Sequence, residues 1–113
     1  MIVEQRTYTL FTGKVPEYLR LYGEEGREIQ EPILGHMVGW FTANDIGDLN
    51  QIVHLWAYDS LEHRAERRAA LAASPAWQGF VAKLQPLIRT QESKILTPAP
   101  WSPVGGGGRA GGS

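Results

Sequence analysis

Residues 50–62, near the middle of the chain, carry the strongest indication of the fold. They read Asn50-Gln-Ile-Val-His-Leu-Trp-Ala-Tyr58 and continue as Asp59-Ser-Leu-Glu62. The first part is rich in β-branched and aromatic residues, which is typical of a strand. The second part offers a capping acceptor, Asp59, and a glutamate three residues later, which predicts the start of a helix. The stretch therefore predicts a strand that leads directly into a helix.

The residues that follow continue this helix and then interrupt it. Alanines and arginines carry the helix to about Ala73, and Ser74-Pro75 predicts a new start, with serine as the cap and proline in the first turn. Beyond the break, apolar residues recur at helical spacing and predict one buried face: Trp77, Phe80, Val81 and Leu84. Pro86 ends that helix. Residues 87–96 form a more polar strand candidate, expected near a sheet edge.

Three elements precede the quoted stretch. Residues 2–10 alternate in character, which predicts a strand. A helix follows from Val15; it contains two glycines that weaken it, and we expect Pro32 to end it. Residues 33–42 form an apolar, β-rich run. A loop of turn-forming residues links this run to the strand at 50–58, which predicts a hairpin.

The elements follow in the order β-α-β-β-α-β. This order predicts an α+β, ferredoxin-like fold, a four-stranded antiparallel sheet with helices on one face. The other face would be bare, and pairing with a second copy across a twofold axis would cover it. We expect one domain over residues 1–103, followed by a flexible glycine-rich tail over 104–113, which is either a native terminus or an appended linker.

Composition argues against several classes of function. Eleven basic and twelve acidic residues give a net charge of −1, which disfavours a nucleic-acid partner. The chain has no cysteine, no metal-ligand spacing of histidines and no glycine-rich phosphate loop after a strand, so we expect neither a metal nor a cofactor. No segment approaches the roughly 18 apolar residues of a membrane span, and no secretory or transit signal is evident. We therefore expect a cytoplasmic protein without membrane association.

Alternation along the strands gathers polar and aromatic side chains on one face of the predicted sheet. We expect Arg6 and Tyr8 of the first strand to share that face with residues of the other two, namely His54, Trp56 and Tyr58, and with His36 and Trp40. Aromatic walls with a few polar groups are typical of a pocket for an aromatic ligand. His54 could act as a general base and Arg6 could hold a carboxylate or enolate, so these two are the candidate catalytic residues. The alternative is that the whole set serves packing and dimer contacts.

Several segments resemble the NIPSNAP family. Glu4-Gln-Arg-Thr-Tyr-Thr-Leu10 with Gly13-Lys-Val-Pro16 resembles the opening of NIPSNAP domains, and residues 54–68 resemble the most specific stretch of the family. Three shorter segments complete the pattern: Pro75-Ala-Trp-Gln78, Gln91-Glu-Ser-Lys-Ile-Leu96 and Pro98-Ala-Pro100. The resemblance runs from about residue 2 to residue 103.

One arginine of the family motif joins the candidates for ligand binding. Arg64, Arg67 and Arg68 lie within little more than one helical turn and could bind a phosphate or carboxylate, although nearby glutamates favour a solvated face. Arg64 follows Tyr58 in the motif and is the one we retain. The predicted ligand-binding residues are therefore Tyr8, Trp40, Trp56, Tyr58 and Arg64.

The resemblance implies a dimeric α+β barrel, in which two ferredoxin-like sheets form one barrel. That superfamily includes cofactor-free monooxygenases, polyketide cyclases and dehalogenating or decarboxylating enzymes, which act on small and often aromatic molecules. Two interpretations stay open. The chain is a small-molecule-binding homodimeric domain, which could be a cofactor-independent enzyme for an aromatic or acidic metabolite, or it is a non-catalytic interaction or assembly module. A cavity of several hundred cubic ångströms near His54 and Arg6 would favour the first, and solid packing the second.

Overall fold

The structure, a computed structural model, describes residues 1–106. Its secondary structure follows the predicted order, with both helical connections divided into shorter pieces. The elements are β1 (Ile2–Leu10), α1 (Val15–Leu21), the π-helical turn η1 (Tyr22–Gly26), α2 (Arg27–Leu34), β2 (His36–Ala43), β3 (Gln51–Tyr58), α3 (Leu61–Ala72), α4 (Pro75–Leu84), the 3₁₀ turn η2 (Gln85–Leu87) and β4 (Ile88–Leu96).

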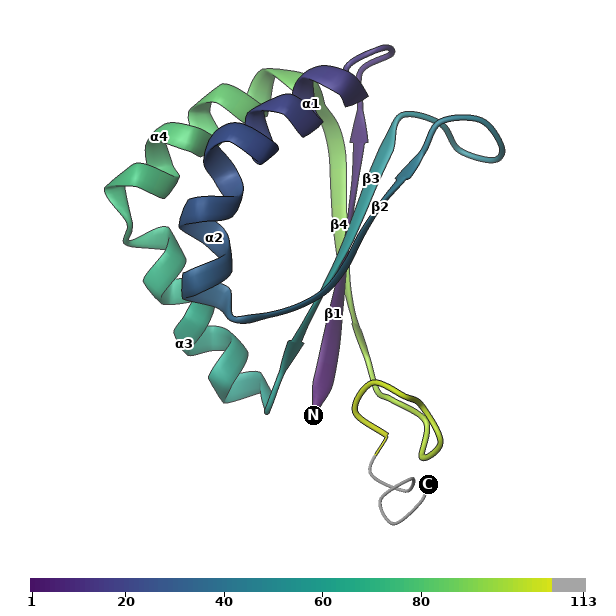
Figure 1. Ribbon diagram of the computed structural model, residues 1–113, viewed down its shortest axis with the longest axis vertical. Helices are drawn as coiled ribbons and strands as arrows, with labels where there is room; N and C mark the ends of the chain where they lie inside the picture. The colour runs from purple at the N-terminus through teal and green to yellow at the C-terminus, as the bar shows by residue number, and fades with distance from the viewer. Residues whose placement is uncertain (107–113) are drawn as a thin grey trace.

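The four strands form one antiparallel sheet in the order β2-β3-β1-β4. All four helices cover the same face of this sheet, and the opposite face has no helix against it (Figure 1). The α+β, ferredoxin-like architecture predicted from the element order is thereby confirmed. β1 lies in the centre, where Arg6 is opposite His54 of β3 on one side and Ser93 of β4 on the other.

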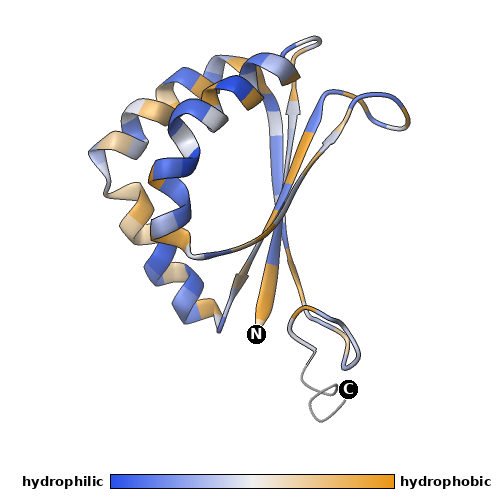
Figure 2. Ribbon diagram, in the orientation of Figure 1, coloured by the Kyte–Doolittle hydropathy of each residue, from blue (hydrophilic) through white to orange (hydrophobic). Residues whose placement is uncertain are grey.

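The core lies between the sheet and the helices, in two adjoining clusters. Figure 2 shows hydrophobic and hydrophilic residues alternating along the helices, as amphipathic helices require. The first cluster joins α1, η1 and α4 to the sheet and contains Leu10, Val15, Tyr18, Leu21, Tyr22, Ile52, Phe80, Leu84 and Leu87. The second lies under α2 and α3 and contains Leu34, Trp56, Tyr58 and Leu71. Each fully buried large apolar side chain contributes about 1.5–3 kcal/mol to folding.

Pro32 does not end the first helical connection, contrary to the prediction. α2 continues through it to Leu34, so residues 33 and 34 are helical rather than part of the strand. Leu34 is buried against Trp56 and Tyr58, and this burial holds the additional turn in place. The helix ends at Gly35, which has a φ of 98° that favours glycine.

The capping signals are correct at one helix and displaced by one residue at the other. Ser74 caps α4 as predicted, since its hydroxyl accepts a hydrogen bond from the Trp77 N–H at 3.2 Å. At α3 the cap is Ser60 and not Asp59, because the Ser60 hydroxyl accepts from the His63 N–H at 3.0 Å. Ser60 adopts the extended backbone that a capping residue needs.

The segment that follows β4 turns back against the helix-free face of the sheet. Five residues of this segment line a shallow depression there together with Val3, Val38, Leu55 and Leu96: Thr97, Pro98, Ala99, Ser102 and Val104. The predicted tail, 104–113, lies outside the described residues from 107 onward. Across residues 1–106, every helix falls short of the length and hydrophobicity that a membrane span requires.

Candidate functional site

A fully buried carboxylate lies on the helix-covered face of β1. The Glu4 side chain has no solvent exposure, and its oxygens accept hydrogen bonds from Arg6 at 2.9 Å, from Arg64 at 2.9 and 2.8 Å, and from the Ser93 hydroxyl. Burial by itself raises the pKa of Glu4, but hydrogen bonds from Arg64 and Ser93 and the charge of Arg6 outweigh it and lower the pKa to about 2. The carboxylate is therefore ionised, and the two guanidinium groups leave the cluster with an excess positive charge.

Arg6 is committed to this cluster and to its neighbour on β1. Its Nη1 donates to Glu4, and its Nε and Nη2 donate to the Tyr8 hydroxyl at 3.1 and 2.7 Å. All three guanidinium nitrogens thus have protein partners. Tyr8 in turn stacks on His54, with ring centroids 5.5 Å apart.

His54 is enclosed by aromatic rings on three sides. Trp40 of β2 stacks on one face of the imidazole, with centroids 4.2 Å apart and planes 10° apart, and Tyr8 stacks on the other. At the ring edge the Trp56 Nε1–H donates to His54 Nδ1 at 2.6 Å. The imidazole is 1% exposed. Burial, and next the charge of Arg6, lower the pKa of His54 to about 3, so the ring is neutral at pH 7.

Two buried polar atoms on β3 lack a partner. Across residues 1–106, neither Nε2 of His54 nor the hydroxyl of Tyr58 has one. Such atoms are uncommon in folded proteins, because an unpaired buried donor costs about 1–3 kcal/mol. They mark β3 as the strand with unused hydrogen-bonding capacity.

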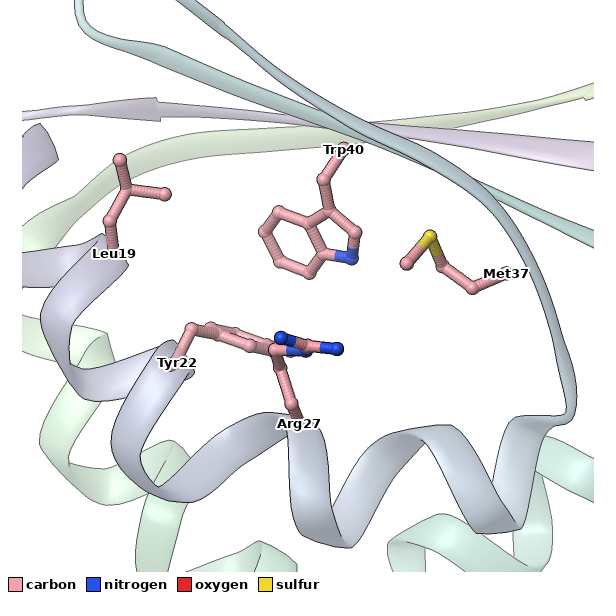
Figure 3. A pocket seen from close by; sticks show the side chains of 6 residues that line it. Leu19, Tyr22, Arg27, Met37 and Trp40 are labelled. Atoms are coloured by element: carbon pink, nitrogen blue, oxygen red, sulfur yellow. The ribbon is translucent and has the colours of Figure 1, made fainter.

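A cleft of about 330 Å³ lies between β2 and the first helical connection, which consists of α1, η1 and α2. It is lined by Leu19, Tyr22, Gly23, Arg27, Met37 and Trp40. Trp40 and Tyr22 touch, with ring centroids 4.6 Å apart, and form a continuous aromatic wall. Figure 3 shows Leu19 and Met37 at the two ends of this wall, with the Arg27 guanidinium next to Tyr22 and the Trp40 indole nitrogen on the Met37 side.

The predicted site residues gather on one face of the sheet, but they do not line one pocket. The helix-covered face carries Arg6, Tyr8, Trp40, His54, Trp56 and Tyr58, and Arg64 reaches it from α3. Of these predicted residues, only Trp40 lines the cleft, and its ring lies between the cleft and His54. Arg6 and His54 line neither this cleft nor the depression beside residues 97–99 on the helix-free face.

The prediction that His36 shares the face of Trp40 is wrong. The register between β2 and β3 shifts between Met37 and Gly39, so His36 is opposite Ala57 and lies on the helix-free face, whereas Trp40 is opposite His54. A bulge adds one residue to a strand and inverts the alternation on one side of it.

Sequence reasoning also missed most of the cleft. Tyr22, Gly23 and Arg27 come from the π-helical turn and the start of α2, where the sequence indicated only a weakened helix. The available signal is the pair of glycines that weaken the helix at this point. The structure forms a π-helical turn there, and such turns are frequent at functional sites. No group of three His, Asp or Glu side chains able to hold a metal ion occurs in residues 1–106.

Sequence comparisons relate this chain to the NIPSNAP family. The sequence model of the NIPSNAP family matches residues 3–103. Protein NipSnap of Drosophila melanogaster is 42% identical over 102 residues, which are 90% of this chain and 36% of that protein. NipSnap homolog 3A of Homo sapiens is 34% identical over 99 residues, which are 87% of this chain and 39% of that protein. The chain spans only 19% to 41% of the length of eight curated relatives that it matches.

Solved structures agree with this relationship. A NIPSNAP family protein of unknown function from Agrobacterium tumefaciens is 49% identical, with a TM-score of 0.89 over 92% of this chain and 93% of that one. An antibiotic biosynthesis monooxygenase is 14% identical, with a TM-score of 0.58 over 88% of this chain and 100% of that one, and shares the fold alone. The match to the family model over nearly the whole described chain, together with these relatives, shows that the chain belongs to the NIPSNAP family.

Proposed function

We propose that this NIPSNAP domain binds a small aromatic acid in the cleft between β2 and the first helical connection. The observation that carries the proposal is the composition of the cleft: a continuous aromatic wall, apolar ends and a guanidinium group. Ligand pockets are mostly apolar and contain a few polar groups that fix the orientation of the ligand. With about 330 Å³, the cleft is at the small end of the usual range and suits a ligand of one or two rings.

Two hydrogen-bond donors of the cleft are available to an acid group. Arg27 donates from Nε to Glu31 at 2.6 Å, and within residues 1–106 its two terminal amino groups have no partner. The Trp40 indole N–H likewise makes no hydrogen bond in the described part of the chain. A carboxylate near these donors would gain charge-assisted hydrogen bonds while the ligand ring packs against Tyr22 and Trp40.

Binding, rather than catalysis by Arg6 and His54, is the function that the geometry favours. Arg6 has all its guanidinium nitrogens occupied by Glu4 and Tyr8. His54 has a pKa of about 3 and would be a weak general base near neutral pH. Their role in catalysis stays a prediction, and so does ligand binding by Tyr8, Trp56, Tyr58 and Arg64.

We also propose that the domain forms a homodimer through the helix-free face of the sheet. That face carries Val53 and Leu55 of β3, and Phe41 of β2 is 59% exposed. Apolar side chains on an uncovered sheet face favour association with a second copy. The interaction-module alternative would use this same face and leave the cleft without a ligand.

The experiment that tests ligand binding fills the cleft from Gly23. Gly23 lines the cleft, and a Cβ there would meet no atom within 4 Å, so we expect the larger side chain of Gly23→Leu to reduce the space in the cleft. The binding of 2-naphthoate is measured by isothermal titration calorimetry. We expect it to bind the unmodified protein and to bind this variant at least about tenfold more weakly. Gly79→Leu on α4 is the matched control, because Gly79 also has open space around it but lies away from the cleft.

A second pair of variants tests the acid group. Arg27→Gln should weaken 2-naphthoate by about five- to tenfold, as expected for the loss of one charge-assisted hydrogen bond at a partly solvated site. Arg20→Gln is its control, since Arg20 forms the same type of exposed i, i+4 pair, with Glu24, and does not line the cleft. Equal affinities in Arg27→Gln and Arg20→Gln would contradict the proposed role of Arg27.

A further inference from the structure

The arginine of the cleft is paired with a carboxylate at the surface of α2. Arg27 Nε donates to Glu31 Oε2 at 2.6 Å, and the two side chains keep 61% and 32% of their surface exposed. Within residues 1–106, this is the one side-chain hydrogen bond that either residue makes. The terminal amino groups of Arg27 and the second carboxylate oxygen of Glu31 are therefore accessible to a ligand.

A second depression, of about 370 Å³, adjoins the cleft at this pair. It is lined by Gly23, Arg27, Glu28, Glu31 and Pro32, and the first two of these residues also line the cleft. The two depressions therefore meet at Gly23 and Arg27, and the Glu31 carboxylate lies within hydrogen-bond distance of this border. A ligand that binds Arg27 from the cleft reaches the edge of the second depression.

The charged side chains along the two depressions do not balance. Their linings contain one cation, Arg27, and two anions, Glu28 and Glu31. An anionic ligand that binds Arg27 is therefore also repelled by two nearby carboxylates. An ammonium group beside the acid group of the same ligand would turn this repulsion into attraction.

The spacing of the Arg27–Glu31 pair fits a ligand with two adjacent, opposite charges. In an α-amino acid, standard bond lengths place the ammonium nitrogen about 2.5 Å from the carboxyl carbon. The charged groups of the protein are similarly close, with 2.6 Å between Arg27 Nε and Glu31 Oε2. A carboxylate on the terminal amino groups of Arg27 therefore leaves the ammonium group of the same molecule within reach of Glu31.

We propose that the ligand of the cleft is an aromatic α-amino acid. Its carboxylate binds Arg27, its ammonium group binds Glu31, and its ring packs against the aromatic wall of Tyr22 and Trp40. This inference rests on the proposed function and narrows it from aromatic acids to aromatic zwitterions. It makes Glu31 a specificity-determining residue, although Glu31 does not line the cleft itself.

Two indole acids that differ only in the ammonium group test the proposal. L-Tryptophan carries this group, and indole-3-propionate has a hydrogen in its place. By isothermal titration calorimetry at pH 7, we expect the unmodified protein to bind L-tryptophan about two- to fivefold more tightly, the usual range for a partly solvated ion pair. Equal affinities, or a preference for indole-3-propionate, would overturn the proposal.

A pair of variants assigns the preference to Glu31. In Glu31→Gln the preference for L-tryptophan should fall to about one. Glu24→Gln is the matched control and should keep the preference, because Glu24 forms the same type of exposed i, i+4 pair, with Arg20, and lines neither depression. A preference that survives in Glu31→Gln would overturn the assignment.

A third compound tests the acid end of the zwitterion without any variant. Tryptamine keeps the indole ring and the ammonium group of L-tryptophan but lacks the carboxylate. We expect the unmodified protein to bind tryptamine more weakly than L-tryptophan, because the contact with Arg27 is lost. Binding of tryptamine as tight as that of L-tryptophan would show recognition of a cation alone and would overturn the inference.

The two proposals fail in different ways. Binding of L-tryptophan and indole-3-propionate with equal affinity, weakened alike by Gly23→Leu, would leave the proposed function standing and remove the role of Glu31. If neither of these acids nor 2-naphthoate binds, or if binding is insensitive to Gly23→Leu, the proposed function fails and this inference fails with it.

Discussion

Arg64 and Glu4 form a two-point contact that joins α3 to the centre of the sheet. The Nε and Nη2 atoms of Arg64 lie 2.9 and 2.8 Å from the two carboxylate oxygens of Glu4, whose side chain is fully buried. Such paired geometry is the strongest form of arginine–carboxylate contact. It explains why this arginine, predicted as a ligand-binding residue, has its guanidinium group directed into the protein.

Loss of the Arg64 contact should destabilise the fold. Arg64→Gln leaves the buried Glu4 carboxylate with only Arg6 and Ser93 as partners, and we expect a loss of about 2 kcal/mol in the free energy of unfolding, measured by urea titration. Arg67→Gln is the control, because Arg67 makes a single long contact, 3.4 Å to the Ile33 carbonyl. Similar losses in both variants would show that the pairing with Glu4 contributes little.

The buried imidazole of His54 should make the stability of the protein depend on pH between pH 7 and pH 5. The pKa of His54 is about 3 in the folded state against 6.5 in the unfolded chain, so between these values the unfolded state binds the extra proton. Stability therefore falls as pH drops below 6.5. From pH 7 to pH 5 the loss attributable to His54 is about 2 kcal/mol, because each pH unit below 6.5 costs about 1.4 kcal/mol.

Thermal or urea unfolding between pH 7 and pH 5 checks this expectation. His54→Gln should flatten the dependence, whereas His36→Gln, at an exposed histidine, should keep it. Above pH 4.5 the titration of Glu4 does not interfere, since its pKa is lowered from 4.5 to about 2 and its contribution is lost only below 4.5. A His54→Gln variant as pH-dependent as the unmodified protein would contradict the assignment.

The two glycines of η1 should respond in opposite ways to alanine. A Cβ at Gly26 would lie 2.5 Å from the Phe80 ring and 2.8 Å from the Tyr22 ring, both buried, so Gly26→Ala should destabilise by about 1–3 kcal/mol despite its better helix propensity. Gly23→Ala meets no atom within 4 Å and should raise stability by up to about 1 kcal/mol. Chemical denaturation of the two variants measures both signs, and destabilisation by both would show that η1 itself requires glycine.

Association through the helix-free face predicts an unequal effect of two equally exposed apolar residues. Phe41 on that face is 59% exposed and Leu61 at the start of α3 is 58% exposed. Sedimentation velocity at micromolar concentration should show a dimer of the 12.5 kDa chain for the unmodified protein and for Leu61→Glu, and a monomer for Phe41→Glu. A monomeric unmodified protein would remove the dimer proposal.

The order of the elements, and which side chains of the central strands share a face, could be predicted from local sequence patterns. Strand alternation, the Ser74-Pro75 start signal and the stripe from Trp77 to Leu84 are local patterns, and a residue expresses them wherever its segment lies in the fold. For this reason Arg6 and His54 were correctly expected on one face of the sheet, where the register places them opposite each other.

The contacts and charge states of those side chains depend on the packed fold. Glu4 and Arg64 are sixty positions apart, and their pairing depends on how α3 packs on the sheet. The bulge between Met37 and Gly39 places His36 on the other face, and burial keeps the His54 ring neutral and makes it a weak base. The cleft exists only because the first helical connection packs against β2 and brings Tyr22 and Arg27 close to Trp40. Desolvation and contacts between distant segments exist only in the packed fold, so local sequence patterns could not supply them.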